Sequence, residues 1–557
     1  MTLNYDAAAA QVTAPGERFE TEEIVLSGTT VLAFKNAPQS LREVFAASRN
    51  FGDQPFLVYE DERWTFTDVM DAVDGLAVAL VERYGVTKGD RVSIGMRNYP
   101  EWVIAFAAIT SVGAISVSLN AWWTEDELDY ALEDSGSKVL IGDVERVERS
   151  RASAARLGMA TIGVRLPEGR SFDATERWED VVVAGAPMPD VDVLGEDDAT
   201  ILYTSGTTGR PKGAVSTHAA IVQSLTAFGC RAAIDRIRRP DAPKPDGAPS
   251  FILIVPLFHV TGCVPVMLSC FSAGIKLVIM YKWDPERALE LIERERVTNF
   301  VGVPTQSWDL LESPSFSTRD TSSLISVGGG GAPAPPQLVA RVDSSFKKAR
   351  PSLGYGMTET NAYGPGNNGD DYVQRPTSTG RVVPVMQVEV RDPEGQALPA
   401  GQSGEIWFQG PNLIRGYWNK PEATAETIVD GWLRTGDLGR VDDEGFVYVE
   451  DRAKDMVLRA GENVYCAEVE AAIYEHPSVY EAAVFGVPHE RLGEEVAAAV
   501  YLRTGLTLTI EELQAHVRER LAPFKAPTHV TFFAAPLPRN PAGKILKREL
   551  RDSVVAD

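Results

Sequence analysis

The regular alternation of helix-like and strand-like segments after residue 60 constrains the fold of this chain more than any other feature. Apolar residues at helical spacing are followed each time by a short apolar run of strand length. Helix-start and helix-stop residues separate the segments, among them Pro100, Gly113 and the capping pair Thr124 and Glu127. The pattern predicts helices over 69–81, 100–112 and 124–136, and strands over 91–96, 115–119 and 139–141. Such alternation is typical of an α/β fold with a parallel sheet covered by helices.

The pattern changes twice further along the chain. Short β-type segments and turn signals dominate residues 388–449 and predict a β subdomain. After Asp451 a compact unit follows, with expected helices over 467–476 and 509–521 and strands over 479–487 and 495–503. We therefore expect an irregular N-terminal extension at 1–40, a large α/β domain at 41–451 and a small, mobile α+β domain at 452–557.

The charge balance limits the partners of the chain. Its 557 residues include 54 Lys and Arg against 78 Asp and Glu, a formal net charge of −24. This balance argues against nucleic acid or an anionic membrane as a general partner, because both are polyanions. Residues 251–275 lack charged side chains and have the length of a membrane span, but Pro256, Pro265 and two glycines interrupt them. We expect a broken strand–turn–helix there rather than an integral membrane segment.

The cysteines and the N-terminus indicate a reducing compartment. Cys230, Cys263, Cys270 and Cys466 form no C-x-x-C pair, and no histidine lies at zinc-finger spacing. We expect free thiols. Residues 1–16 have neither the basic nor the apolar region of a signal peptide, so a cytoplasmic location is expected.

The string Tyr203-Thr-Ser-Gly-Thr-Thr-Gly-Arg-Pro-Lys-Gly213 carries the strongest chemical signal. Its glycines allow backbone N–H groups to approach an anion closely, and its hydroxyls and Lys212 add donors and a positive charge. The spacing is not that of a Walker A loop, because Pro211 stands where the Gly-Lys pair would begin. The string predicts a phosphate-binding loop of another type.

This string resembles the phosphate-loop signature of the adenylate-forming enzymes, the superfamily of acyl-CoA synthetases, peptide-synthetase adenylation domains and luciferases. Further motifs follow in the family's order from about Leu41 to Leu550: Gly328 to Ala332, Gly354 to Thr360, Thr435-Gly-Asp437, Asp451 to Asp455 and Asn540 to Lys544. The resemblance is greatest to fatty-acyl- and aryl-CoA synthetases. It implies ATP, Mg²⁺ and coenzyme A as the cofactors.

The resemblance also implies roles for single residues. Tyr355 would stack on adenine, Thr358 would contact the α-phosphate and Glu359 would help to hold Mg²⁺. Asp437 would accept hydrogen bonds from the ribose hydroxyls, with Arg452 as a further ribose contact. The full set of implied nucleotide and cofactor contacts is Thr204, Ser205, Gly206, Thr207, Thr208, Lys212, Gly330, Gly331, Ala332, Gly354, Tyr355, Gly356, Thr358, Asp437, Arg452 and Gly461.

A two-step mechanism with a moving small domain follows from the same resemblance. Lys544, with Thr204, His259 and Glu359, would serve the attack of a carboxylate on the α-phosphate, which gives an acyl-adenylate and pyrophosphate. The small domain would then rotate about a hinge at Lys454. That rotation would withdraw Lys544 and bring the loop around Gly461 towards the site, where a thiol attacks the acyl carbon and AMP leaves.

The segment Pro256-Leu-Phe-His-Val-Thr-Gly262 resembles the acyl-pocket lining of acyl- and aryl-CoA synthetases, with His259 near the substrate carboxylate. A hydrogen-bonded core histidine is the alternative interpretation. Amino-acid-activating domains usually carry Phe-Asp here, so Phe258-His259 disfavours an amino acid as substrate. The expected substrate-binding residues are His259, Val303, Gly330, Gly354, Met357 and Asn361. Their small or apolar side chains favour a fatty, branched or aryl acid.

The sequence therefore favours an ATP-dependent carboxylic acid–CoA ligase acting on small molecules. Two alternatives stay open: an adenylating enzyme that passes the acyl group to an amine or a carrier protein, and a binding or light-emitting relative without ligase activity. A homodimer is compatible with the sequence. The basic, proline-rich segment 231–250 is expected to be an exposed loop, with contact to the 3′-phosphate of CoA as the alternative.

Overall fold

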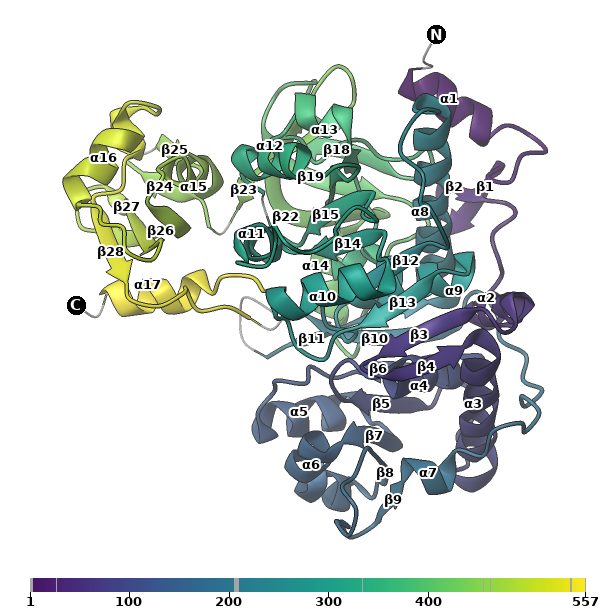
Figure 1. Ribbon diagram of the computed structural model, residues 1–557. Coiled ribbons are helices and arrows are strands. Elements are labelled where there is room, and N and C mark those ends of the chain that lie inside the picture. Colours follow the sequence, from purple (N-terminus) through teal and green to yellow (C-terminus); the bar gives the residue numbers. More distant parts are fainter. Residues whose placement is uncertain are drawn as a thin grey trace.

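The computed structural model describes residues 4–26, 28–204, 210–332, 334–453, 455–460, 462–540 and 543–555. Two eight-stranded sheets and a five-stranded sheet form the large part of the molecule, and another five-stranded sheet lies in the C-terminal part, at the left of Figure 1. The chain is therefore a mixed α/β protein, and the α/β prediction is confirmed.

The first large sheet contains the elements that the alternation predicts. Its strand order is β20-β11-β10-β6-β5-β7-β8-β9, and the strands from β10 to β9 are parallel. The strands are β5 Arg91–Gly95, β6 Ile115–Ser118, β7 Val139–Asp143, β8 Ala160–Val164, β9 Thr175–Arg177, β10 Asp198–Thr204, β11 Lys212–Thr217 and β20 Gly416–Tyr417. The helices of this region are α3 Phe66–Val78, α4 Pro100–Ser111, α5 Glu125–Ser135, α6 Val144–Leu157 and α7 Trp178–Val181. Helix α4 buries all 12 of its residues, which explains its mostly apolar sequence.

The second large sheet has the strand order β17-β16-β15-β14-β12-β13-β3-β4. Its strands are β3 Pro55–Tyr59, β4 Glu62–Thr65, β12 Ser250–Leu253, β13 Lys276–Ile279, β14 Asn299–Gly302, β15 Ser326–Gly330, β16 Arg350–Gly354 and β17 Gly366–Asn368. The helices around it are α2 Leu41–Ser48, α8 His218–Arg238, α9 Ser269–Ala273, α10 Pro285–Glu295, α11 Pro304–Glu312, α12 Pro336–Ser345 and α13 Asp370–Gln374. The β3–β4 hairpin thus closes a sheet whose other strands come much later in the sequence.

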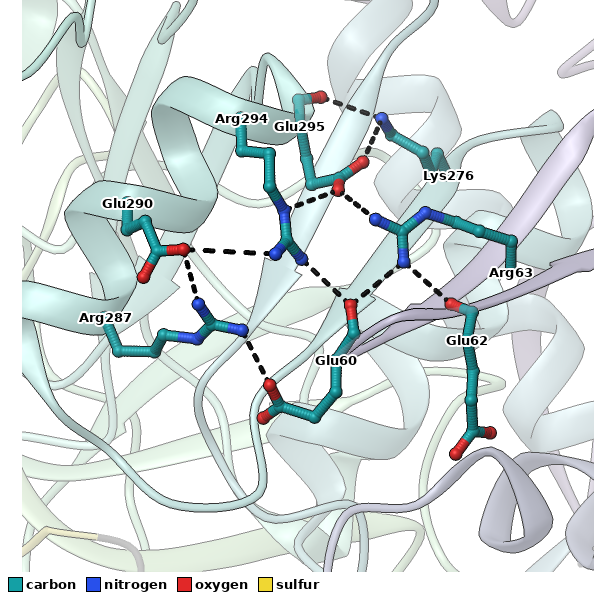
Figure 2. Close-up of polar contacts among 8 residues, drawn as sticks. All are labelled: Glu60, Glu62, Arg63, Lys276, Arg287, Glu290, Arg294 and Glu295. Atoms are coloured by element: carbon teal, nitrogen blue, oxygen red, sulfur yellow. Dashed lines mark hydrogen bonds and ion pairs between the residues drawn. The ribbon is translucent and has the colours of Figure 1, made fainter.

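A network of charged side chains ties this hairpin to helix α10 (Figure 2). The buried carboxylate of Glu295 accepts hydrogen bonds from Arg63 at 2.7 Å, Arg294 at 3.0 Å and Lys276 at 3.2 Å. Arg287 pairs with Glu60 at 2.6 Å. Because Glu295 is surrounded by cations from three elements, its burial costs less than that of an unpaired carboxylate.

The remaining elements form the β subdomain and the small C-terminal part. The β subdomain contains β18 Gln387–Arg391, β19 Gly404–Gln409, α14 Pro421–Thr427, β21 Ile428–Val429, β22 Trp432–Val441 and β23 Val447–Arg452. The C-terminal part contains β24 Val457–Arg459, β25 Glu462–Val464, α15 Cys466–Tyr474, β26 Val479–His489, β27 Gly493–Leu502, α16 Ile510–Arg518, β28 His529–Phe533 and α17 Lys547–Val555. It has apolar cores of its own on both faces of its sheet. The boundary after residue 451 stays a prediction.

The structure corrects the expectation of an irregular N-terminal extension. Helix α1, Tyr5–Val12, packs against α8, and β1, Thr21–Leu26, pairs with β2, Thr29–Phe34. Figure 1 shows α1 and both strands beside α8. Ala8 and Ala9 are buried in the main core, and so is Phe19. The extension is therefore regular and forms part of the large core, which its weak local periodicity concealed.

The expectation of an exposed loop over 231–250 is wrong for its first eight residues. Helix α8 continues to Arg238, and the side chain of Arg231 is buried. Its guanidinium donates hydrogen bonds to the carbonyl oxygens of Gly364 at 2.7 Å, Gly366 at 2.9 Å and Arg381 at 2.7 Å. Partners more than a hundred residues away thus satisfy a basic side chain that looked like a surface residue.

The apolar segment 251–275 forms β12, a π-helical turn at Gly262–Leu268 and α9, as the broken strand–turn–helix prediction requires. Among the described residues, no helix is long and apolar enough to cross a membrane. The four cysteines are buried free thiols.

Candidate active site

A cavity of about 260 Å³ lies where the large part of the molecule meets the C-terminal part. Its wall includes Tyr355, Asp437, Arg452 and Lys544, four residues that the sequence singled out. Gly331, Ala332, Gly354, Gly356 and Met357 line it as well, together with Val303. Residues far apart in the sequence, from Val303 to Lys544, therefore face one space.

Strand pairing brings the acidic and basic groups of this cavity together. Strands β22 and β23 are antiparallel, and Asp437 stands opposite Arg452. The Nε atom of Arg452 lies 3.2 Å from Oδ1 of Asp437, and the hydroxyl of Tyr355 donates to Oδ2 at 2.5 Å. Burial and the charge of Asp437 raise the pKa of Tyr355, so the phenol stays neutral. Asp437 is thus a buried carboxylate held in one orientation.

Lys544 reaches the same cavity from a tight turn. Its backbone N–H donates to Oδ1 of Asn540 at 2.9 Å, and its carbonyl accepts from the Asn540 N–H at 2.8 Å. Burial, with a further contribution from the positive charge of Arg452, lowers the pKa of Lys544 to about 8. The ammonium is therefore destabilised when no anion occupies the cavity.

The two ends of the expected phosphate loop are fixed as neighbours. Thr204 ends β10 and stands opposite Lys212 at the start of β11. Ser205, Gly206, Thr207 and Thr208 lie outside the described residues, as do the hinge candidate Lys454 and Gly461. Any anion bound by the loop would therefore lie near Lys212.

Tyr417 connects Lys212 to the expected metal residue, and the sequence did not single it out. Strand β20 places Tyr417 beside β11, where the Lys212 ammonium lies 5.2 Å from the centre of its ring. The Tyr417 hydroxyl donates to the buried carboxylate of Glu359 at 2.7 Å. Only the pairing of β20 with β11 reveals this link, because nothing in the local sequence marks it.

Glu359 can hold Mg²⁺ only together with ligands from the substrate. It lies with Thr358 in a 3₁₀ turn, Thr358–Thr360. Among the described residues, no group of three or more His, Cys, Asp or Glu side chains is arranged to hold a metal ion. Mg²⁺ commonly binds through one or two carboxylates plus substrate phosphates, so a lone buried carboxylate near a phosphate loop fits this ion.

A second cavity, of about 740 Å³, adjoins the first. Gly331, Leu353, Gly354, Tyr355 and Gly356 belong to both walls, and Gly330 lines the second. The second cavity runs between helix α8 and the strands β14, β15 and β16. Sequence analysis missed its α8 wall, whose only signal is a set of small and apolar residues on one helix face: Leu225, Phe228, Gly229, Ala232 and Ala233.

His259 and Asn361 occupy different environments from each other. Burial, with the positive charge of Lys544, lowers the pKa of His259 to about 4, and its Nδ1 accepts from the Thr261 N–H at 3.3 Å. The imidazole is therefore neutral at pH 7 and close enough to Lys544 to sense its charge. Neither His259 nor Asn361 lines either cavity; Asn361 is fully buried and bonds to Ser216 and the Asn412 carbonyl.

Comparisons with known proteins agree with this geometry. The chain matches the family model of the AMP-binding enzymes over residues 44–418 and that of the AMP-binding enzyme C-terminal domain over residues 468–544. It is 38% identical to a feruloyl-CoA synthase from Amycolatopsis sp., over 87% of this chain and 93% of that protein. It is 34% identical to a long-chain fatty-acid–CoA ligase from Mycobacterium tuberculosis, over 89% of this chain and 94% of that protein. The ATP-bound structure of MatB from Rhodopseudomonas palustris superposes with a TM-score of 0.80 at 31% identity, covering 92% of this chain and 98% of that one.

Proposed function

The chain belongs to the AMP-binding enzyme family as an adenylate-forming acyl-CoA synthetase, and on that premise we propose how its two cavities divide the reaction. It is an AMP-forming acid–thiol ligase that uses ATP and CoA. The observation that carries the division is that Asp437, Arg452 and Lys544 line a smaller cavity, which shares wall residues with a larger apolar one.

The small cavity is the nucleotide site in this proposal. Asp437, oriented by Tyr355 and Arg452, accepts the ribose hydroxyls, and the Tyr355 ring lies against the adenine. Lys212 and Lys544 bind the phosphates in this proposal, together with the hydroxyl and N–H groups of the loop between Thr204 and Lys212. Mg²⁺ would be held by Glu359 and phosphate oxygens, where it would neutralise charge as pyrophosphate leaves.

The large cavity holds the body of the acid, whose carboxylate points towards His259 and Lys544. The carboxylate oxygen attacks the α-phosphorus, the bond to pyrophosphate breaks, and an acyl-adenylate forms. A neutral His259 can donate a hydrogen bond to the carboxylate without adding charge, and Lys544 offsets the repulsion between two anions. The apolar walls fit a fatty or aryl acid.

The thiol of CoA then attacks the acyl carbon, loses its proton, and displaces AMP. We propose that Lys544 leaves the cavity for this step as the small domain, 452–557, turns about Lys454 and brings Gly461 in. Lys544 lines the same cavity as Tyr355, Asp437 and Arg452 in this arrangement. This arrangement therefore suits the first step rather than the second.

Two further expectations remain proposals. We propose a cytoplasmic enzyme, because four buried free thiols suit a reducing compartment. We retain a homodimer as a proposal, which sedimentation of the purified protein would test.

A pyrophosphate-release screen tests the function. Purified enzyme is supplied with MgATP and a panel of fatty, aryl and amino acids, with and without CoA. We expect pyrophosphate release with fatty or aryl acids and formation of the acyl-CoA thioester when CoA is present. Pyrophosphate release that leads only to amides would contradict this function, and so would the absence of release with every acid. Lys544→Ala should abolish release while it largely spares thioester formation from preformed acyl-AMP.

A further inference from the structure

The far end of the acyl cavity is basic, although its middle is apolar. Arg18, Arg231 and Arg236, named here the distal arginines, all line the cavity. Arg231 is buried beside Gly366, which pairs with Gly354, whereas Arg18 and Arg236 are exposed at the rim. Arg18 comes from the N-terminal extension, next to Phe19, whose ring packs near Gly229 of α8. Arg231 and Arg236 come from α8 itself. The extension that appeared irregular in sequence therefore contributes a cation to the substrate cavity.

Helix periodicity shows why Arg236 belongs to the cavity. The α8 residues that line the cavity share one helix face, because they recur every three or four positions. They are Leu225, Phe228, Gly229, Ala232 and Arg236. At about 1.5 Å of rise per residue, this face is roughly 16 Å long from Leu225 to Arg236. Near its start, Ser224 bonds to the carbonyl of Asn361, in the segment that follows the nucleotide motif. Arg236 lies at the other end of this helix face from Leu225.

The distal arginines have no carboxylate partner within the described part of the chain. Their neighbours on the same helix do: Arg238 pairs with Asp371 at 2.5 Å and Arg239 with Asp235 at 2.8 Å. The guanidinium of Arg231 is bonded to backbone carbonyls and to the Tyr363 hydroxyl, which carry no net charge. Asp235 lies close enough to Arg231 to raise its pKa, and the exposed Arg18 and Arg236 keep their charge in contact with solvent, in a chain whose net charge is −24.

An anion would complete this end of the cavity. A purely hydrocarbon chain would offer the exposed guanidinium groups of Arg18 and Arg236 nothing in place of water, whereas a carboxylate would accept charge-assisted hydrogen bonds from them. We propose that the preferred acid carries a second carboxylate at its far end, so that the substrate is a long dicarboxylic acid with an apolar middle. This inference rests on the proposed function, because it assigns the substrate class of the same site.

The cavity also limits the length of the acid. An extended hydrocarbon chain of the acid advances about 1.2 Å per bond. The value is taken from an extended protein backbone, in which the three bonds of one residue span at most about 3.6 Å. A path of roughly 16 Å along α8 therefore corresponds to about 13 bonds between the two ends. Acids of about twelve to fourteen carbons should let one carboxylate reach the phosphates and the other reach Arg236.

Matched acids test the proposal on the full-length enzyme. kcat and KM for pyrophosphate release are measured with dodecanedioic acid, dodecanoic acid and hexanedioic acid. The wild-type enzyme should prefer the twelve-carbon diacid over the monoacid. In Arg236→Gln and in Arg18→Gln, KM for dodecanedioic acid should rise about tenfold, which is the usual effect of losing one charged hydrogen bond. KM for dodecanoic acid should stay unchanged or fall. Arg231 is left intact because its burial makes unfolding the expected result of substitution.

Two controls make the outcomes distinguishable. Arg296→Gln removes a surface arginine that pairs with Asp320 outside both cavities, and it should change no acid's KM. Ala232→Phe should narrow the cavity midway and reduce activity with both twelve-carbon acids. The proposal would be overturned if Arg236→Gln and Arg18→Gln changed KM equally for the monoacid and the diacid. It would also be overturned if the wild-type enzyme preferred the monoacid. Either result would leave the ligase assignment intact. Failure of every acid to release pyrophosphate would refute the proposed function itself.

Discussion

A hydrogen bond between helix α11 and the C-terminal part should control the balance between the two half-reactions. The hydroxyl of Tyr480 donates to Asp309 at 2.5 Å, and Asp309 is fixed by Trp283 at 2.9 Å. Beside it, Glu312 accepts hydrogen bonds from Arg503 and, at 3.0 Å, from Arg341. Both contacts are present in this arrangement, in which Lys544 lines the nucleotide cavity, so we expect them to stabilise the arrangement that suits adenylation.

The magnitude follows from the chemistry of this contact. A hydrogen bond to a charged acceptor contributes about 1.5–3 kcal/mol, and partial exposure of Tyr480 places it at the lower end. Tyr480→Phe should therefore weaken the adenylating arrangement by about 1.4 kcal/mol, which is about tenfold in its population relative to other arrangements. The ring remains, so its packing against Tyr501 is kept.

Single-turnover measurements separate the two steps. Pyrophosphate release from enzyme, MgATP and acid reports the first, and thioester formation from preformed acyl-AMP and CoA reports the second. Tyr480→Phe should slow the first step by up to about tenfold and leave the second unchanged or faster. Tyr448→Phe is the matched control, because its hydroxyl bonds to Asp442 at 3.1 Å within the β subdomain. Equal effects of Tyr480→Phe on both steps, or the same effect from Tyr448→Phe, would refute the reasoning.

Three further predictions concern the nucleotide cavity. Because burial and the charge of Arg452 lower the pKa of Lys544 to about 8, kcat/KM for ATP should fall as pH rises above about 8, when the ammonium is lost. Lys544→Arg should move that decline to higher pH, since guanidinium stays charged; an unmoved pH profile would exclude Lys544 as its source. Asp437→Asn should raise KM for ATP about tenfold or more and abolish the preference for ATP over 2′-deoxy-ATP, and a retained preference would count against the ribose role. Glu359→Gln should raise the Mg²⁺ concentration for half-maximal pyrophosphate release, whereas an unchanged requirement would place the metal elsewhere.

The sequence predicted those parts of the structure whose causes are local. The Thr124–Glu127 capping box forms as expected, with the Thr124 N–H donating to Glu127 at 2.8 Å. The motif residues Tyr355, Asp437, Arg452 and Lys544 line one cavity, although their catalytic and binding roles stay proposals.

The features that sequence analysis missed depend on distant partners. Arg231 is buried because carbonyl oxygens from Gly364 to Arg381 accept its N–H groups, and no local pattern announces them. Tyr417 reaches Glu359 only because β20 joins the edge of β11. Asn361 was expected at the acyl pocket, but its backbone is left-handed, with φ of 51°, and the turn directs its side chain into the core.

The early hairpin β3–β4 has a consequence for how the chain folds during synthesis. Arg63 and its partner Glu295 are 232 residues apart, and the strand that receives β3 is also made late. At about 5–20 residues per second, the ribosome leaves the hairpin without its neighbour for roughly 10–50 s. During that interval an open strand edge invites pairing with other nascent chains. Glu60 lies at the hairpin turn and Glu62 and Arg63 on β4, so charged side chains flank the uncharged β3 edge that waits for β13. We expect them to limit aggregation until they join the network around Glu295.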